Sequence, residues 1–449
     1  MNFTKQQVDD LNAIVKVKVQ EDDYASTVEK ILKGYQKKAN MPGFRPGKVP
    51  AGMIKKMYYK PVLVEEINKL LNQKISDYIQ ENKLEVLGQP LPRVADDSTI
   101  DWENQKEFEF AYDLGLSPKF EVDLSPKEKF NYYLVKVEDK LTDKYVNDIA
   151  KRYGKLINPE VSESGDLLFG DFQEVDASGQ NVEGGISKTS TLALDIIKDE
   201  EIKKQFVGIS KGAAVIIDPN KIAENSPDMA SLLGVTQDVA QQLNNQVKFT
   251  ITNISRMEPA ELNIDFFKKV YGDEVNTVEH FRERVNEELN NMYVAESERK
   301  FKNDVVLRLV QNLNLNLPDA FLKRWLVAAN EKPITLEQVS SEYNNYSQAL
   351  RWQLIENKIS RANQINVSNE EVVDYTKTLI RKQFARFNQN EMNEQELSNT
   401  AQRVLGDEKE SRRLFEKLFD EKLITLFKAS FTLVDKEISE EDFYKLSAE

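Results

Sequence analysis

The feature that most constrains the fold is a long segment, residues 276–315, that contains neither glycine nor proline. Its apolar side chains recur at helical spacing: Val278, Phe281, Val285, Leu289, Met292, Phe301, Val305, Leu309 and Leu313. An average globular helix has about 11–12 residues. A pattern this long therefore predicts a helical arm. A low apolar content (40%) and a high charged content (30%) likewise favour an elongated, multidomain molecule.

The region after Pro259 is predicted to be all-helical. Further helices are expected from Pro318, over residues 335–362, from Ser368 and over residues 408–431. Ser368 opens the sequence SNEE, which is a capping box. The turn LNLNLPDAF before the Pro318 helix would set two helices antiparallel. The fold class expected here is a helical body with arms.

The amino-terminal region, residues 1–115, is predicted to be an α+β domain. Alternating apolar residues indicate strands at residues 13–19 and 106–116. Between them, one helix is expected over residues 21–40, a second from Pro50, and a third over residues 62–81. Proline-marked residues 116–153 read as a connector with a helix capped by Thr142, and residues 160–256 as a small β-rich domain.

Composition excludes several classes of function. The chain has no cysteine and a single histidine, His280, on a polar face, so thiolate, disulfide and histidine-based chemistry are not expected. A net charge of −14 disfavours DNA or anionic membrane as a general partner. No signal-peptide or membrane-spanning run and no phosphate-binding glycine loop is seen. We expect a cytoplasmic protein without metal, cofactor or ATP requirement.

One short stretch departs from this acidic background. Residues 30–60 contain nine lysines or arginines and no acidic residue, and NMPGFRPGKVP (residues 40–50) lies at their centre. Exposed charges are screened beyond about 8 Å at physiological salt, so a compact basic patch can bind a polyanion although the remainder repels it. Composition alone leaves a second interpretation open, in which Phe44 packs in its own core and the lysines are only solvated.

The sequence GFRPGKVP, residues 43–50, resembles the ribosome-docking motif G-F-R-x-G-x-x-P of the bacterial trigger factor family. Residues 63–90, 108–124, 315–326 and 365–372 are similar to the same family in order and spacing. The resemblance implies docking through Gly43, Phe44, Arg45, Gly47, Lys48 and Pro50. Pro46 stands where many members have lysine, and Lys48 or a neighbouring helix lysine would replace that cation.

This resemblance also implies a domain plan and partners. It assigns residues 1–115 to ribosome binding, 116–153 to a connector joined to the helical body, 154–257 to an FKBP-like domain and 258–449 to a substrate-cradling helical domain. The implied function is that of an ATP-independent chaperone for nascent or unfolded chains. The implied partners are RNA and protein of the large ribosomal subunit, with a weak homodimer away from the ribosome.

The alternative function is peptidyl-prolyl cis-trans isomerisation by the FKBP-like domain. That chemistry needs a dry aromatic pocket, yet the region between Gln173 and Lys248 has one aromatic residue, Phe206. Val182 stands where the family usually has an aromatic ring, and Asp199-Glu200-Glu201 replaces Ile-Pro-Gly. We therefore expect a degenerate pocket at Phe172, Val182, Ile202 and Phe206, with weak or absent activity.

Client-binding residues are expected among apolar side chains of the helical region. The candidates are Phe321, Trp325, Trp352, Phe384 and Phe387. At helical spacing each of these side chains is individually more often core than client surface.

Overall fold

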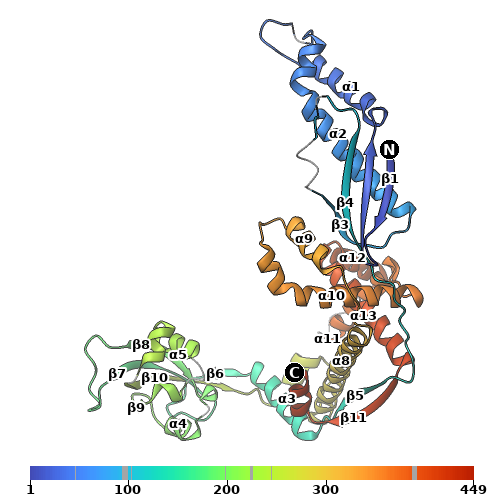
Figure 1. The fold of residues 1–449 in the computed structure, drawn as a ribbon. Helices are drawn as coiled ribbons and strands as arrows, with labels where there is room; N and C mark the ends of the chain where they lie inside the picture. The colour runs from blue at the N-terminus through green and yellow to red at the C-terminus, as the bar shows by residue number, and fades with distance from the viewer. Residues whose placement is uncertain are drawn as a thin grey trace. The chain divides into compact units, whose positions relative to one another are not determined.

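The computed structural model describes residues 1–45, 47–93, 100–102, 104–197, 199–222, 226–243, 245–386 and 392–448. It has mixed helices and strands, a small sheet-based region and a largely helical carboxy-terminal region, which confirms the predicted fold class (Figure 1). Two compact units are each assembled from three segments. One contains Met1–Asn131, Lys300–Val367 and Phe419–Val434, and the other contains Tyr132–Arg299, Ser368–Leu418 and Asp435–Glu449.

The first unit begins with an antiparallel sheet of order β1-β2-β4-β3. Its strands are β1 (Asn2–Gln7), β2 (Asn12–Val19), β3 (Val86–Pro92) and β4 (Phe108–Leu116). Helices α1 (Glu21–Lys38) and α2 (Ala51–Glu81) lie along one face (Figure 1). The core between them is filled by alternate strand residues, among them Val15, Val17 and Val19, and by apolar helix positions such as Ile67 and Leu71.

Helix α2 corrects one prediction. Two helices, from Pro50 and over residues 62–81, were expected, whereas α2 runs unbroken through Pro61. An internal proline removes one backbone hydrogen bond and costs about 3 kcal/mol. Ile54, Val62 and Leu63 around it are all buried, and this burial offsets the cost because each such side chain contributes about 1.5–3 kcal/mol.

Helices α9 (Asp319–Ala329) and α10 (Leu336–Ala362) complete a second core of this unit against β3 and β4. Two glycines make room for the rings of α9. A Cβ on Gly88 would lie 2.7 Å from Trp325, and one on Gly115 would lie 2.4 Å from Phe321. The large rings of α9 are thus seated directly on the sheet backbone.

Gly115→Ala is expected to destabilise this unit by about 1–3 kcal/mol, because the added methyl overlaps the buried ring of Phe321. Gly52→Ala is the control, since a Cβ there meets nothing within 4 Å and alanine favours the helix. Chemical denaturation followed by circular dichroism measures both. Equal stability of the two variants would show that the packing adapts freely.

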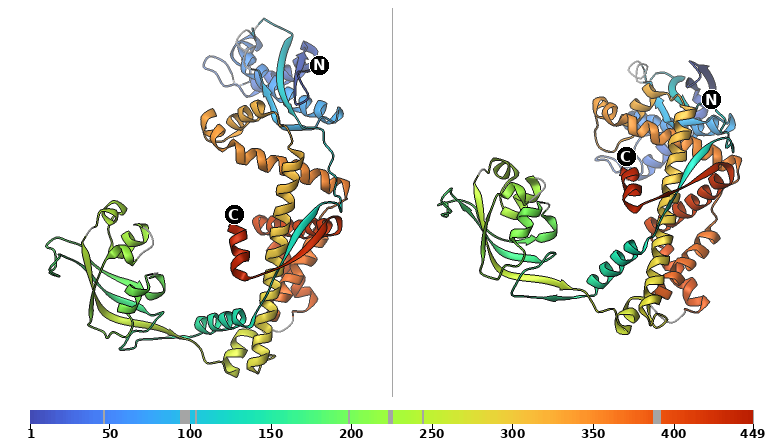
Figure 2. Two further views of the ribbon diagram at one scale, coloured as in Figure 1. Left: turned by 60° about the horizontal axis from the view of Figure 1, so that its bottom comes forward. Right: turned by 90° about the horizontal axis from the view of Figure 1, so that it is seen from below.

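The second unit contains the small sheet domain. Strands β6 (Lys155–Ile157), β10 (Gln246–Glu258), β7 (Leu167–Val175) and β8 (Ser187–Ala193) follow in that order, and β9 (Ala214–Ile217) also pairs with β10. Helices α4 (Glu200–Gln205), α5 (Ser226–Leu233) and α6 (Gln237–Gln242) contribute to a single core with the strands. Figure 2 shows this region, in green, as a sheet with short helices beside it. Short 3-10 turns occupy Leu194–Ile196 and Pro219–Lys221.

The remaining elements are mainly helices. They are α3 (Asp139–Arg152), α7 (Ile264–Tyr271), α8 (Val278–Leu313), α11 (Asn369–Arg386), α12 (Glu394–Leu405), α13 (Glu408–Ser430) and α14 (Glu440–Ala448). The predicted long helix is confirmed as α8, which has 36 residues. Helix α3 begins before Thr142, because Glu138 and not Thr142 is its N-cap. Strand β5 (Lys129–Val135) pairs with β11 (Thr432–Ile438), a sheet that the sequence did not predict.

Within the described ranges, no helix is long and apolar enough to cross a membrane. The same residues contain no group of three or more His, Cys, Asp or Glu side chains that could hold a metal ion.

Candidate docking site on the loop between α1 and α2

The docking loop, residues 39–50, joins α1 to α2. Its two ends are tied together, because Gly47 N donates to Ala39 O at 3.1 Å and Gln36 Nε2 donates to Val49 O at 2.8 Å. The side chain of Val49 is 1% exposed, and its burial anchors the end of the loop that leads into α2. These contacts hold the two ends of the loop together at the tip of the helical hairpin.

Two glycines give the loop its shape. Gly43 has φ +86° and Gly47 has φ +77°, a region that side chains with a Cβ rarely adopt. A Cβ on Gly47 would also lie 3.0 Å from the carbonyl oxygen of Lys37 at the end of α1. Both glycines of the motif are thus required by the backbone itself.

The side chains at the middle of the docking loop face outward. Phe44 is 37% exposed, and Arg45, Lys48 and Pro50 are exposed as well. No ion pair of Arg45 or Lys48 is found in the described part of the chain. Pro46 lies outside the described residues. The ring of Phe44 and the guanidinium of Arg45 are therefore accessible to another molecule.

All nine basic side chains of residues 30–60 are exposed. Of these nine side chains, only that of Lys33 forms an ion pair within the described part of the chain; its ammonium lies 3.3 Å from the carboxylate of Glu29. The ammonium of Lys55 lies 5.0 Å from the ring centre of Tyr59, a cation–π contact. Most of this positive charge is thus uncompensated within the unit, and it can attract an anionic partner.

Four exposed apolar side chains beside the docking loop were missed by the sequence analysis. They are Tyr35, Met53, Met57 and Tyr58. The rings of Tyr35 and Tyr58 lie 5.2 Å apart and join the two helices. The i, i+4 spacing of Met53 and Met57 was the available signal. The basic tip therefore also offers an apolar contact surface.

The four residues of the predicted degenerate isomerase pocket are placed mainly in the core. Phe172 and Phe206 are fully buried, Ile202 is buried and Val182 is half-buried. Phe249 packs against Phe172 at 4.3 Å and against the edge of Phe206 at 6.1 Å between ring centres. The rings of Phe172, Phe206 and Phe249 therefore fill the interior of this domain, whereas Phe169 on β7 is 37% exposed.

The sheet domain also contains a buried ion pair that the sequence did not reveal. The side chain of Asp166 is 0% exposed and accepts two hydrogen bonds from Arg256, at 2.8 and 2.9 Å. It also accepts the backbone N–H of Glu163 at 2.7 Å. The bond to Asp166 raises the pKa of Arg256 above its ordinary value. This pair closes the segment before β7 onto β10.

The five predicted client residues lie in different environments. Phe321 is 2% exposed, and Trp325 packs with it against β3. Trp352 is half-buried on α10, and Phe384 is half-buried against Ile380 of α11. Phe387 lies outside the described residues. Of the four candidates that the structure describes, only Phe321 and Trp325 lie together, and they do so in the interior of the unit.

Three family models match most of the chain. "Bacterial trigger factor protein" matches residues 1–149, "Probable trigger factor, FKBP-like domain" residues 156–259, and "Probable trigger factor, C-terminal domain" residues 297–447.

The chain is also similar to curated proteins named trigger factor. That of Chloroherpeton thalassium is 23% identical, with 82% of this chain and 84% of the relative covered. That of Pelagibacter ubique is 25% identical, with 100% and 90% covered. A solved trigger factor chaperone structure is 15% identical, with a TM-score of 0.41 and coverage of 95% of this chain and 99% of that one.

Proposed function

The chain belongs to the trigger factor family, and from this we propose that it is an ATP-independent chaperone of the cytoplasm that docks on the large ribosomal subunit and holds emerging polypeptides. The observation that carries the proposal is the docking loop, in which two glycines with positive φ shape the backbone, the phenyl ring of Phe44 is exposed and the guanidinium of Arg45 has no ion-pair partner among the described residues. A self-contained turn would bury the ring and neutralise the cation. The domain plan predicted from the sequence is retained as part of this proposal.

The electrostatics suit a ribosomal partner. Arg45 can make a bidentate, charge-assisted contact with a phosphate or a carboxylate, and the exposed lysines add long-range attraction. Phe44 and the neighbouring Met53 and Met57 can enter an apolar crevice of a ribosomal protein. The rest of the chain is acidic and is repelled by RNA, which limits the contact to this tip.

The helices support a holding function. Exposed apolar side chains are scattered singly along them, for example Val294, Leu307, Leu336, Phe415 and Tyr444. Dispersed apolar contacts bind unfolded segments weakly and at many points without forming one large sticky patch. Such binding needs no nucleotide.

The chaperone proposal is tested by diluting a chemically denatured client protein into buffer and following light scattering. We expect stoichiometric amounts of the full chain to suppress aggregation without ATP. Aggregation that proceeds as fast as in the presence of an inert acidic protein would contradict the proposal.

Prolyl isomerisation is a weaker candidate, and the buried rings of the sheet domain count against it. In a refolding reaction limited by proline isomerisation, whose uncatalysed phase lasts about 10–100 s, substoichiometric chain is expected to leave the rate constant nearly unchanged. The change in intrinsic fluorescence of the refolding protein measures this rate constant. Multiple-turnover acceleration of that phase would contradict this prediction.

A further inference from the structure

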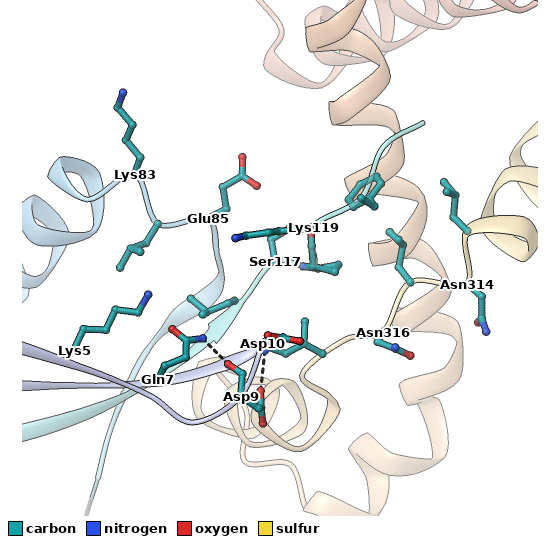
Figure 3. Close-up of a pocket in the computed structure, with 17 residues that line it drawn as sticks. Lys5, Gln7, Asp9, Asp10, Lys83, Glu85, Ser117, Lys119, Asn314 and Asn316 are labelled. Carbon is teal, nitrogen blue, oxygen red and sulfur yellow. Dashed lines mark hydrogen bonds between the residues drawn. The ribbon is translucent and has the colours of Figure 1, made fainter. Parts of the chain in front are cut away.

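A large cavity lies within the first unit, at the end of the amino-terminal sheet opposite the docking loop. Its volume is about 1090 Å³. Four parts of the chain line it: β1 with the β1–β2 turn, the α2–β3 connection, the residues after β4, and the turn after α8 (Figure 3). We call this space the junction cavity.

The cavity lies where α2 ends beside β1 before that strand does. Phe3 of β1 stacks on Tyr78 of α2 at 4.8 Å between ring centres. Alternate residues of a strand share a face, so Lys5 and Gln7 continue this face beyond the last residue of α2, Glu81. The chain then turns away at Lys83, which has a φ of +50°. Beyond the helix end, α2 therefore leaves the β1 edge of this face uncovered.

Three lysines around the junction cavity carry uncompensated charge. Lys5, Lys83 and Lys119 are exposed, and no ion pair is found for them among the described residues. Figure 3 shows them extended from three different lining segments. Lysines held around one cavity without carboxylate partners favour an anionic group as ligand.

Of the three acidic side chains at the same cavity, one is paired with a cation and one accepts hydrogen bonds from neutral groups. Asp9 accepts hydrogen bonds from Leu11 N at 2.7 Å and from Asn12 Nδ2 at 3.0 Å, and these hold the pKa of Asp9 below its usual value. Glu85 pairs with Arg361 at 3.1 Å. Of the lining carboxylates, Asp10 alone has no described partner. Asp9 keeps its negative charge because both of its donors are neutral, so the three lysines face two carboxylates, Asp9 and Asp10, that have no cationic partner among the described residues, and positive charge remains in excess by one.

The terminus of α2 does not reverse this balance. Its last carbonyl groups are capped, because Asn82 N donates to Tyr78 O at 3.1 Å and Leu84 N donates to Ile79 O at 2.9 Å. Capped carbonyls contribute less negative potential than free ones.

The junction cavity has an apolar floor and continues into a second groove. Leu116 and Leu315 are buried in the floor, and Phe120 is half-buried beside them. A neighbouring groove of about 510 Å³ shares Leu84, Glu85, Ser117 and Phe120 with it and runs on to α10. Small-molecule pockets usually hold about 300–1,000 Å³, so the joined space suits a longer, extended ligand.

We propose that the junction cavity binds an extended segment of unfolded polypeptide in which carboxylate side chains flank an apolar one. The apolar side chain would lie on Leu116, Leu315 and Phe120, and the carboxylates would meet Lys5, Lys83 and Lys119. The proposal rests on the chaperone function and names a client class for it: acidic, amphipathic segments. A chain with a net charge of −14 would otherwise repel such segments, so a local cationic site is required to hold them.

The test compares the full chain with two triple variants of equal charge change. Lys5→Glu/Lys83→Glu/Lys119→Glu removes the cations of the junction cavity. Lys127→Glu/Lys332→Glu/Lys382→Glu is the matched control at exposed lysines elsewhere. Fluorescence anisotropy measures binding of two labelled peptides of equal length and identical leucine positions, one carrying glutamates and one carrying lysines.

We expect the wild type and the control to prefer the glutamate peptide, and the cavity variant to bind it about tenfold more weakly than the control does, as three partly exposed ion pairs would give. A photo-reactive leucine analogue in that peptide should cross-link to residues 117–120 or 313–316. Equal affinities of the two variants, or cross-links only elsewhere, would overturn the proposal.

Two further outcomes separate this inference from the general function. If the wild type suppresses aggregation but the cavity variant keeps the full glutamate preference, the junction-cavity assignment is wrong and the chaperone function stands. If the wild type neither binds peptide nor suppresses aggregation, both fail. Single-stranded RNA that binds with the same lysine dependence in place of the peptide would also overturn the polypeptide assignment.

Discussion

Ribosomes are expected to bind the Phe44→Ala/Arg45→Ala double variant about a hundredfold more weakly than the wild type. Burial of a phenyl ring contributes about 1.5–3 kcal/mol, and a hydrogen bond to a charged group about 1.5–3 kcal/mol. Phe44 is already partly covered, which reduces the first contribution. About 2.7 kcal/mol in total, equivalent to a hundredfold change, is therefore the expected loss. Co-sedimentation with empty ribosomes at fixed salt measures it.

The matched control is Arg412→Ala/Phe415→Ala on α13. It removes the same two chemical groups, and Phe415 is similarly exposed at 41%. Its ribosome affinity should equal that of the wild type. If the loop variant binds as tightly as this control, docking does not depend on Phe44 and Arg45.

Asp166→Asn is expected to destabilise the sheet domain by about 1.5–3 kcal/mol. The substitution removes the charge from a fully buried acceptor, a loss of the size of a hydrogen bond to a charged group, while Glu163 remains 2.8 Å from the Arg256 guanidinium, whose side chain is 22% exposed. Hydrogen exchange of the full chain, read by mass spectrometry over residues 155–258, should show faster exchange of β7 and β10, which the pair connects.

Glu160→Gln provides the comparison, because it removes an equal charge from a carboxylate that is 82% exposed and pairs with Lys211 at 3.3 Å. An exposed pair contributes about 0–1 kcal/mol, so exchange should barely change. Equal protection of β7 in the two variants would mean that the buried pair is not needed for the stability of the domain.

Local patterns predicted most helices and the central strands. The apolar spacing of residues 276–315 identified α8, and the cap SNEE identified the start of α11. Each of these signals consists of residues that lie only a few positions apart in the sequence. The exposed basic loop was also accessible from sequence, since nine cations without an acidic neighbour are a compositional feature.

Features that depend on distant partners were not predictable. Strand β11 pairs with β5, which lies in the first third of the chain. Asp166 contacts Arg256, which lies 90 positions later in the sequence. Phe321 and Trp325 looked like candidate client surface, yet Gly115 and Gly88 accept their rings. The exposed contact between Tyr35 and Tyr58 could not be predicted without knowing how α1 and α2 pack. Pairing across sequence distance, and not local propensity, decides each of these cases.

Docking through the loop between α1 and α2 can be observed by site-specific photo-cross-linking on intact ribosomes. One probe replaces Phe44, and the control probe replaces Val8, which is 57% exposed at the opposite end of the same domain, about 45 Å away along α2. We expect the probe at position 44 to cross-link to RNA or protein of the large subunit and the probe at position 8 to remain unlinked. Absence of ribosomal cross-links from position 44, or equal linking from both positions, would show that the chain does not dock through this loop.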